Sequence, residues 1–138
     1  MRPILYLTLL LISLPAFAEQ WLCVTESMTG FTQQKNSPQW EASKFSDKPK
    51  YVISVSQENA SSQYVVKELG KNTTMGSCQY YVNSNNEYFI SCIDDYGNTF
   101  LFNKNGNRFQ YSNVLGGYIY PWLKKRPPYV SIGLCSPF

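Results

Sequence analysis

The sequence predicts an all-β fold, an antiparallel meander of about eight strands that closes into a small barrel or stays partly open. Three observations lead to this prediction. Aromatic residues make up 16% of the 138 residues and include eleven tyrosines, short runs alternate between apolar and polar side chains, and turn-forming residues separate the runs. Tyrosine and phenylalanine favour half-buried pleated surfaces, and no segment keeps a helical period. A two-layer β-sandwich is the alternative architecture.

The first eighteen residues have the pattern of a cleaved signal peptide. Arg2 gives the positive start, residues 4–14 form an apolar run, and Ala16-Phe17-Ala18 is an A-x-A cleavage signal. The apolar run of about eleven residues is shorter than the roughly twenty that a membrane-spanning helix needs. We therefore expect an exported protein, periplasmic or secreted, whose residues 19–138 form a single β domain without a transmembrane segment.

Alternating runs account for the first half of the mature chain. Residues 21–27 read as the first strand, and residues 51–56 read as a later one. Residues 63–70 can oppose the latter across a loop near 57–62. Residues 37–50 are ambiguous between a short strand and a single helical turn.

The stretch CQYYVNSNNEYFISC predicts a β-hairpin that begins and ends with a cysteine. A three-residue loop at Ser84-Asn85-Asn86 sets Cys78 opposite Cys92 and Tyr80 opposite Ile90. The face that these four residues share is apolar. The second strand of this hairpin runs on to a turn that contains Asp95, Tyr96 and Gly97.

The stretch TFLFNKNGNRFQYS predicts a second hairpin. Asn105-Gly106 tolerates the two positive φ angles of a type I′ turn, so its polar centre is expected to be a two-residue turn and not a binding site. The register then sets Phe102 opposite Phe109 and Phe100 opposite Tyr111. Each aromatic pair should stabilise the hairpin by up to ~1 kcal/mol relative to alanine.

All four cysteines lie in the mature region, and an even number in an exported chain indicates two disulfides. The first expected bridge, Cys78–Cys92, crosses the hairpin. The second, Cys23–Cys135, then ties the first strand to the last one, residues 128–136. This long bridge favours a closed barrel over the sandwich, because closure removes exposed sheet edges.

The composition argues against several kinds of chemistry. The chain has no histidine, which removes the usual activated serine or cysteine nucleophiles and the commonest zinc ligand. Asp94-Asp95 is the only adjacent acidic pair. Because neighbours in a strand point to opposite faces, these two carboxylates cannot readily flank one bond of a substrate. Without Arg2, eleven basic and nine acidic residues leave a net charge of +2 on the mature chain. We expect no catalytic, metal or cofactor site, no nucleic-acid partner and a monomer.

One segment, NVLGGYIYPWLKKRPPYV, does not fit the hairpin pattern, because it is long and places aromatic residues directly before a basic run. Such a loop could contact a membrane, an acidic partner or an anionic glycan, or it could only cap one end of the barrel. The leading prediction is a non-catalytic cell-envelope domain that binds a protein, glycan or lipid surface through this loop. A barrel that carries a small apolar ligand is the alternative, and an enzyme ranks third. The expected contact residues are Tyr118, Tyr120, Trp122, Lys124, Lys125 and Arg126.

Three short motifs carry a resemblance. They are Trp21-Leu22-Cys23 at the start, Phe100-Leu101-Phe102-Asn103 followed by Arg108-Phe109, and Gly133-Leu134-Cys135 at the end. In these the chain resembles a loose group of short exported bacterial β-proteins to which we can assign no activity. The resemblance implies export and the cysteine framework, and it carries over no catalytic residue.

Overall fold

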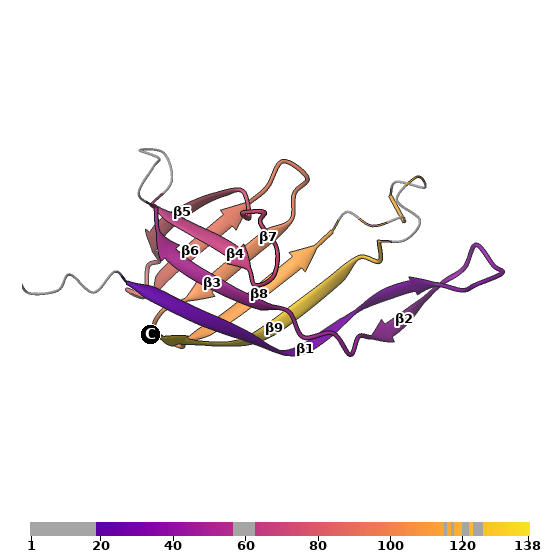
Figure 1. The fold of residues 1–138 in the computed structure, drawn as a ribbon, viewed down its shortest axis with the longest axis horizontal. Coiled ribbons are helices and arrows are strands. Elements are labelled where there is room, and N and C mark those ends of the chain that lie inside the picture. Colours follow the sequence, from indigo (N-terminus) through magenta and orange to yellow (C-terminus); the bar gives the residue numbers. More distant parts are fainter. Residues whose placement is uncertain (1–18, 57–62, 115, 117, 120–121, 123–125) are drawn as a thin grey trace, which may run out of the picture.

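The computed structural model describes residues 19–56, 63–114, 116, 118–119, 122 and 126–138. The described residues form an all-β structure without a helix, so none of them belongs to a helix able to cross a membrane. Its strands, labelled in Figure 1, are β1 (Gln20–Gln33), β2 (Trp40–Lys44), β3 (Lys50–Val55), β4 (Tyr64–Glu68), β5 (Ser77–Val82), β6 (Tyr88–Ile93), β7 (Thr99–Asn103), β8 (Arg108–Asn113) and β9 (Tyr129–Pro137).

The strands form a closed antiparallel barrel. The sheet order is β2-β1-β3-β4-β5-β6-β7-β8-β9, and β1 also pairs with β9, so eight strands close the barrel and β2 is an addition to it. The predicted barrel is thus confirmed. The first strand is longer than the sequence indicated, because it continues past the barrel after a register shift between Thr25 and Ser27.

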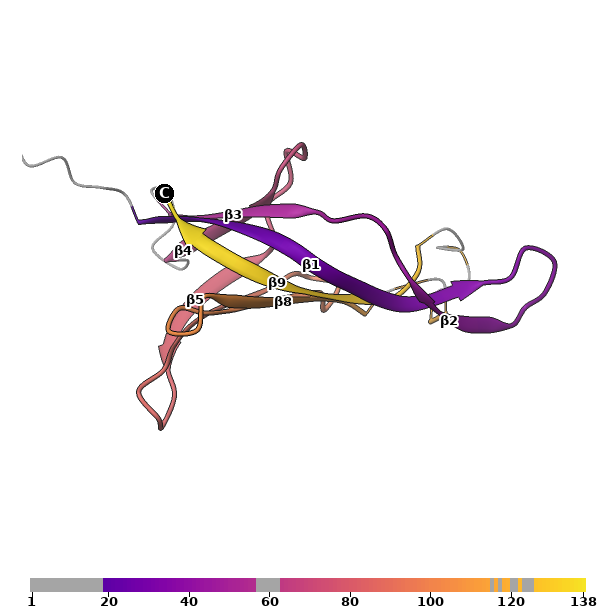
Figure 2. The ribbon, with the colours of Figure 1, turned by 90° about the horizontal axis from the view of Figure 1, so that it is seen from below.

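The extension of β1 pairs with β2, and together they form a hairpin that projects beyond the barrel (Figures 1 and 2). Thr29 lies opposite Lys44, and Gln33 lies opposite Trp40. The ambiguous segment is therefore a short strand and not a helical turn. The reason is tertiary: β1 offers a free edge here, since β3 pairs only with its first part, up to Val24.

The β5–β6 hairpin has the predicted register. Cys78 lies opposite Cys92, and Tyr80 lies opposite Ile90. The three-residue loop ends on Asn86, whose φ of 59° is left-handed, as loops of this length require.

The β7–β8 hairpin has the predicted register, with Phe102 opposite Phe109, but the predicted type I′ turn is wrong. The loop has four residues between Asn103 and Arg108, and its positive φ of 52° falls on Asn107 instead of on Asn105-Gly106. The side chain of Asn103 explains the difference. Its Oδ1 accepts hydrogen bonds from the backbone N–H groups of Asn105 at 2.9 Å and Gly106 at 3.1 Å, which stabilises a wider turn.

Aromatic side chains and both disulfides fill the barrel interior. The rings of Tyr51, Phe100 and Phe109 pack against one another with centroids 5.3 to 5.5 Å apart. Tyr51 meets both phenylalanine rings edge-on and the two phenylalanine rings stack on each other; each such pair adds about 0.5–1.5 kcal/mol beyond the burial itself. The disulfides Cys23–Cys135 and Cys78–Cys92 each join directly opposed residues, and all four cysteines are buried. Both predicted bridges are confirmed.

The meander gives the barrel two unlike ends. Residues 69–76, 94–98 and 114–128 connect strands at one end, which we call the loop end; the β1–β2 hairpin projects there as well. Residues 83–87 and 104–107 make tight turns at the opposite end. The pairing of β4 with β5 is irregular: Tyr64 lies opposite Cys78, and closer to the loop end Lys67 bridges Thr74 and the N–H of Met75 donates to the Val66 carbonyl at 2.8 Å.

Candidate functional site

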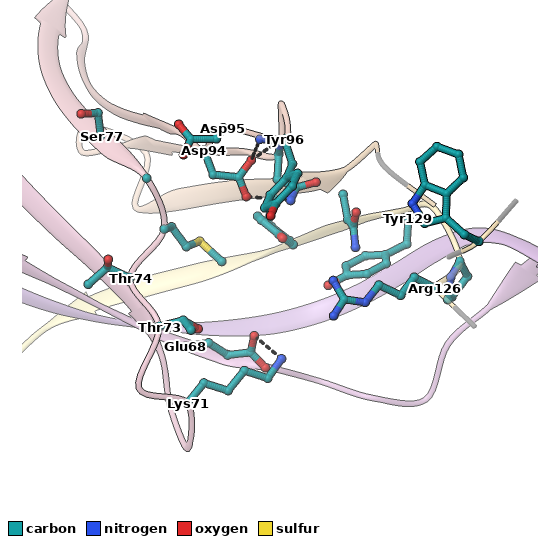
Figure 3. Close-up of a pocket in the computed structure, with 17 residues that line it drawn as sticks. Glu68, Lys71, Thr73, Thr74, Ser77, Asp94, Asp95, Tyr96, Arg126 and Tyr129 are labelled. Carbon is teal, nitrogen blue, oxygen red and sulfur yellow. Dashed lines mark hydrogen bonds and ion pairs between the residues drawn. The ribbon is translucent and has the colours of Figure 1, made fainter. Parts of the chain in front are cut away.

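An open depression of about 1520 Å³ lies at the loop end. Its walls come from the β4–β5 connection, from the β6–β7 turn and from the β8–β9 connection (Figure 3). These segments are far apart in sequence and meet because an antiparallel meander returns every second connection to the same end.

Tyrosines form the floor. Tyr111 and Tyr129 line it with ring centroids 5.8 Å apart, and Tyr51 lies buried beneath them, 5.7 Å from Tyr111. Burial is the main cause that raises the pKa of all three phenols, and charge from Glu68 adds to it. The phenols are therefore neutral at physiological pH, and they act as hydrogen-bonding groups and not as bases.

In the lining, Asn98 Oδ1 is buried without a hydrogen-bond partner among the described residues. Below the floor, the buried hydroxyls of Tyr51 and Ser131 face each other without the geometry of a full hydrogen bond. An unsatisfied buried polar group costs about 1–3 kcal/mol. Native structures keep such groups rare, so the unpaired Asn98 oxygen indicates a position that water or a ligand completes.

Most charged groups in the lining of the depression form ion pairs with one another or hydrogen bonds with the backbone. Lys71 forms an ion pair of 2.8 Å with Glu68. The carboxylate of Asp94 accepts hydrogen bonds from the backbone N–H groups of Tyr96 and Asn98, both at 2.9 Å, and from Asn98 Nδ2 at 2.7 Å. Asp94 therefore holds the β6–β7 turn in the place where the sequence predicted a turn. Arg126 is exposed and extends into the depression alongside Tyr129 (Figure 3).

Of the six predicted contact residues, the structure describes Tyr118, Trp122 and Arg126; Tyr120, Lys124 and Lys125 lie outside the described residues. Trp122 and Arg126 line the depression. Tyr118 instead lies against the projecting hairpin, where its ring meets Trp40 edge-on at 6.0 Å. Exposed fractions of 71% for Tyr118 and 75% for Trp122 leave most of both rings open to solvent.

The opposite end of the barrel is occupied by its own side chains. The Lys104 ammonium lies 4.8 Å from the centre of the Trp21 ring and 5.6 Å from that of Tyr80, and it forms an ion pair with Glu19. Tyr64 donates a hydrogen bond to the same carboxylate at 3.1 Å; burial and this carboxylate raise the pKa of Tyr64 to about 12. The contrast between the ends makes the loop end the candidate site.

Sequence reasoning missed most of the depression. Tyr111 was placed on the core face of its hairpin, and nothing in the local pattern marked residues 69–76 as a wall. Within the part of the chain that the structure describes, no group of three acidic, cysteine or histidine residues could hold a metal, and no cysteine is free.

Comparisons with protein families, with curated proteins and with solved structures find no match to this chain. The resemblance to short exported β-proteins therefore stays a prediction. Any function has to be argued from the geometry of the loop end.

Proposed function

We propose that the protein is an exported, non-catalytic binding domain whose contact surface is the loop end of the barrel. The observation that carries the proposal is the exposed Trp122 at an open depression of the loop end, where the exposed Tyr118 also lies against the projecting hairpin. Tryptophan, tyrosine and arginine are the residues that most often dominate binding energy, and Arg126 supplies the third kind at this surface. The expected partner is a protein, a glycan or a lipid surface of the cell envelope.

The scaffold supports the same proposal. Two disulfides are compatible with an oxidising compartment. A disulfide-tied barrel is a rigid scaffold, and binding residues are often carried on the loops of such scaffolds.

A carrier of an apolar ligand inside the barrel has less support. Tyr51, Phe100 and Phe102 fill the interior as fully buried side chains. An enzyme also has less support, because Asp94 is engaged in the turn and Glu68 is paired with Lys71.

The proposal can be tested by cosedimentation of the mature protein with envelopes of the cell that exports it. Replacing Tyr118 or Trp122 with alanine should weaken binding about tenfold each, which is the effect of losing about 1.4 kcal/mol. Arg126→Ser should weaken binding mainly at low salt, where screening is least.

Tyr88→Ala is the matched control. Tyr88 is an exposed tyrosine next to the opposite end, and it also makes a ring contact, with Tyr80 at 5.8 Å. It should leave binding unchanged. Equal losses in Tyr88→Ala and Tyr118→Ala, with both variants folded by circular dichroism, would reject the loop end as the contact surface.

A further inference from the structure

The lining of the depression is rich in hydroxyl and amide groups and carries little free charge. Thr73, Thr74, Ser77, Asn113 and the two floor tyrosines all contribute such groups. Lys71 offsets Glu68, and the single cation Arg126 faces two carboxylates, Asp94 and Asp95, so the three acidic and two basic residues of the lining leave a net charge of −1. A strongly anionic ligand would need a concentrated positive site, which these residues do not provide.

Two exposed rings come from different loops into the same lining. Tyr96 belongs to the β6–β7 turn and is 70% exposed, while Trp122 belongs to the β8–β9 connection. Ring faces carry partial negative charge and attract polarised C–H groups. A sugar ring offers such groups on its faces and hydroxyls around its rim, so it matches a lining of exposed rings and hydrogen-bonding side chains.

Asn98 adds a directional requirement. Its Nδ2 donates to Asp94 at 2.7 Å, which fixes the orientation of the amide and leaves Oδ1 as a buried acceptor without a partner among the described residues. Only a donor can satisfy this oxygen. A carboxylate or a lipid chain cannot donate, whereas a sugar hydroxyl can take the place of a water that donates to this oxygen.

From these three observations we infer that the depression binds an uncharged carbohydrate chain, with Trp122 and Tyr96 as the surfaces on which sugar rings stack. The inference rests on the proposed binding function and names its ligand class. It replaces the anionic glycan or membrane surface that the basic run of the sequence suggested.

The test uses isothermal titration of the disulfide-intact mature protein with chitotetraose, cellotetraose and maltotetraose, each up to millimolar concentration. Binding of at least one of the three is expected, with an affinity that changes little with salt because the ligand is neutral. Trp122→Ala and Tyr96→Ala should each weaken it about tenfold. Tyr96 helps to hold its turn through its backbone N–H, so removing the ring leaves the turn bonded. Tyr88→Ala should bind like the unmodified protein.

Several results would overturn the inference. They are no heat with any of the three oligosaccharides, binding that survives both ring substitutions, or salt-sensitive binding to anionic phospholipid vesicles in place of sugar binding. Failure of the inference is separable from failure of the proposed function. If Trp122→Ala still weakens binding to envelopes while no oligosaccharide binds, only the carbohydrate assignment falls. If the unmodified protein does not bind envelopes, the proposed function falls.

Discussion

The two disulfides should contribute unequally to stability, although their surroundings are alike. Cys23–Cys135 joins residues 112 apart in sequence, and Cys78–Cys92 joins residues 14 apart. All four cysteines are at most 2% exposed, and the Cα atoms of each bridge are 3.9 Å apart. Replacing either pair with alanines removes the same atoms from the same interior. The difference between the two variants therefore isolates the effect on the unfolded chain.

The size of that difference follows from the entropy of loop closure. The short bridge closes about fifteen residues and should stabilise the fold by about 3 kcal/mol. With the short bridge in place, the long bridge closes an effective loop of about a hundred residues and should stabilise it by about 4.7 kcal/mol. The Cys23→Ala/Cys135→Ala variant should thus be less stable than the Cys78→Ala/Cys92→Ala variant by about 1.7 kcal/mol.

Urea unfolding without reductant, followed by tyrosine and tryptophan fluorescence, measures both free energies of unfolding. The dependence on urea should be steeper for both variants than for the unmodified protein, because a less constrained unfolded chain exposes more surface. Equal losses, or a larger loss for the short bridge, would refute the entropic reasoning. In that case native packing around each bridge would set its contribution.

Three further predictions concern the barrel. Gly133→Ala should destabilise the fold by about 1–3 kcal/mol through overpacking, because its Cβ would lie 2.1 Å from the Val24 carbonyl oxygen. Gly106→Ala is the control, because its Cβ would meet nothing within 3.7 Å. Similar melting temperatures for the two variants would contradict the packing argument. Above pH 10 the unfolded chain loses phenolic protons that the folded chain keeps, since burial raises the pKa of Tyr51 and Tyr111. Urea unfolding from about pH 9 to 11 should show stability falling, by up to roughly 2.7 kcal/mol per pH unit from Tyr51 and Tyr111 alone, and a flat profile would be inconsistent with buried phenols. Tyr51→Phe removes a buried hydroxyl that faces Ser131 without the geometry of a full hydrogen bond, so it should be neutral or stabilising. A loss above about 1 kcal/mol would mean that the hydroxyl is bonded.

Much of the barrel could be predicted because its signals are local. The register of β5–β6 follows from two cysteines and a short loop between them, and that of β7–β8 follows from paired aromatic residues. The turn after Asn103 was mispredicted because a side chain outside the dipeptide decides it. Strand β2 was ambiguous because its partner is an extension of β1 that becomes available only in the closed barrel.

The candidate site also contains residues that the sequence could predict and residues that it could not. Trp122 and Arg126 could be named from sequence because aromatic and basic residues adjoin there. The wall formed by Glu68 and Lys71, and the turn that holds Asn98, could not be assigned to the same surface. These segments lie side by side only because the barrel closes. The Asn98 oxygen is left unsatisfied because the Nδ2 group of the same amide donates its hydrogen bond to Asp94.

The most direct test of the central claim is hydrogen–deuterium exchange of the mature protein, free and bound to envelopes of the exporting cell. Backbone amides in residues 69–76, 94–98 and 126–129 should exchange more slowly when the protein is bound, because these segments surround the depression. The turns at 83–87 and 104–107, at the opposite end, should be unchanged. Protection at those two turns, with none around the depression, would contradict the proposal that the loop end is the binding surface.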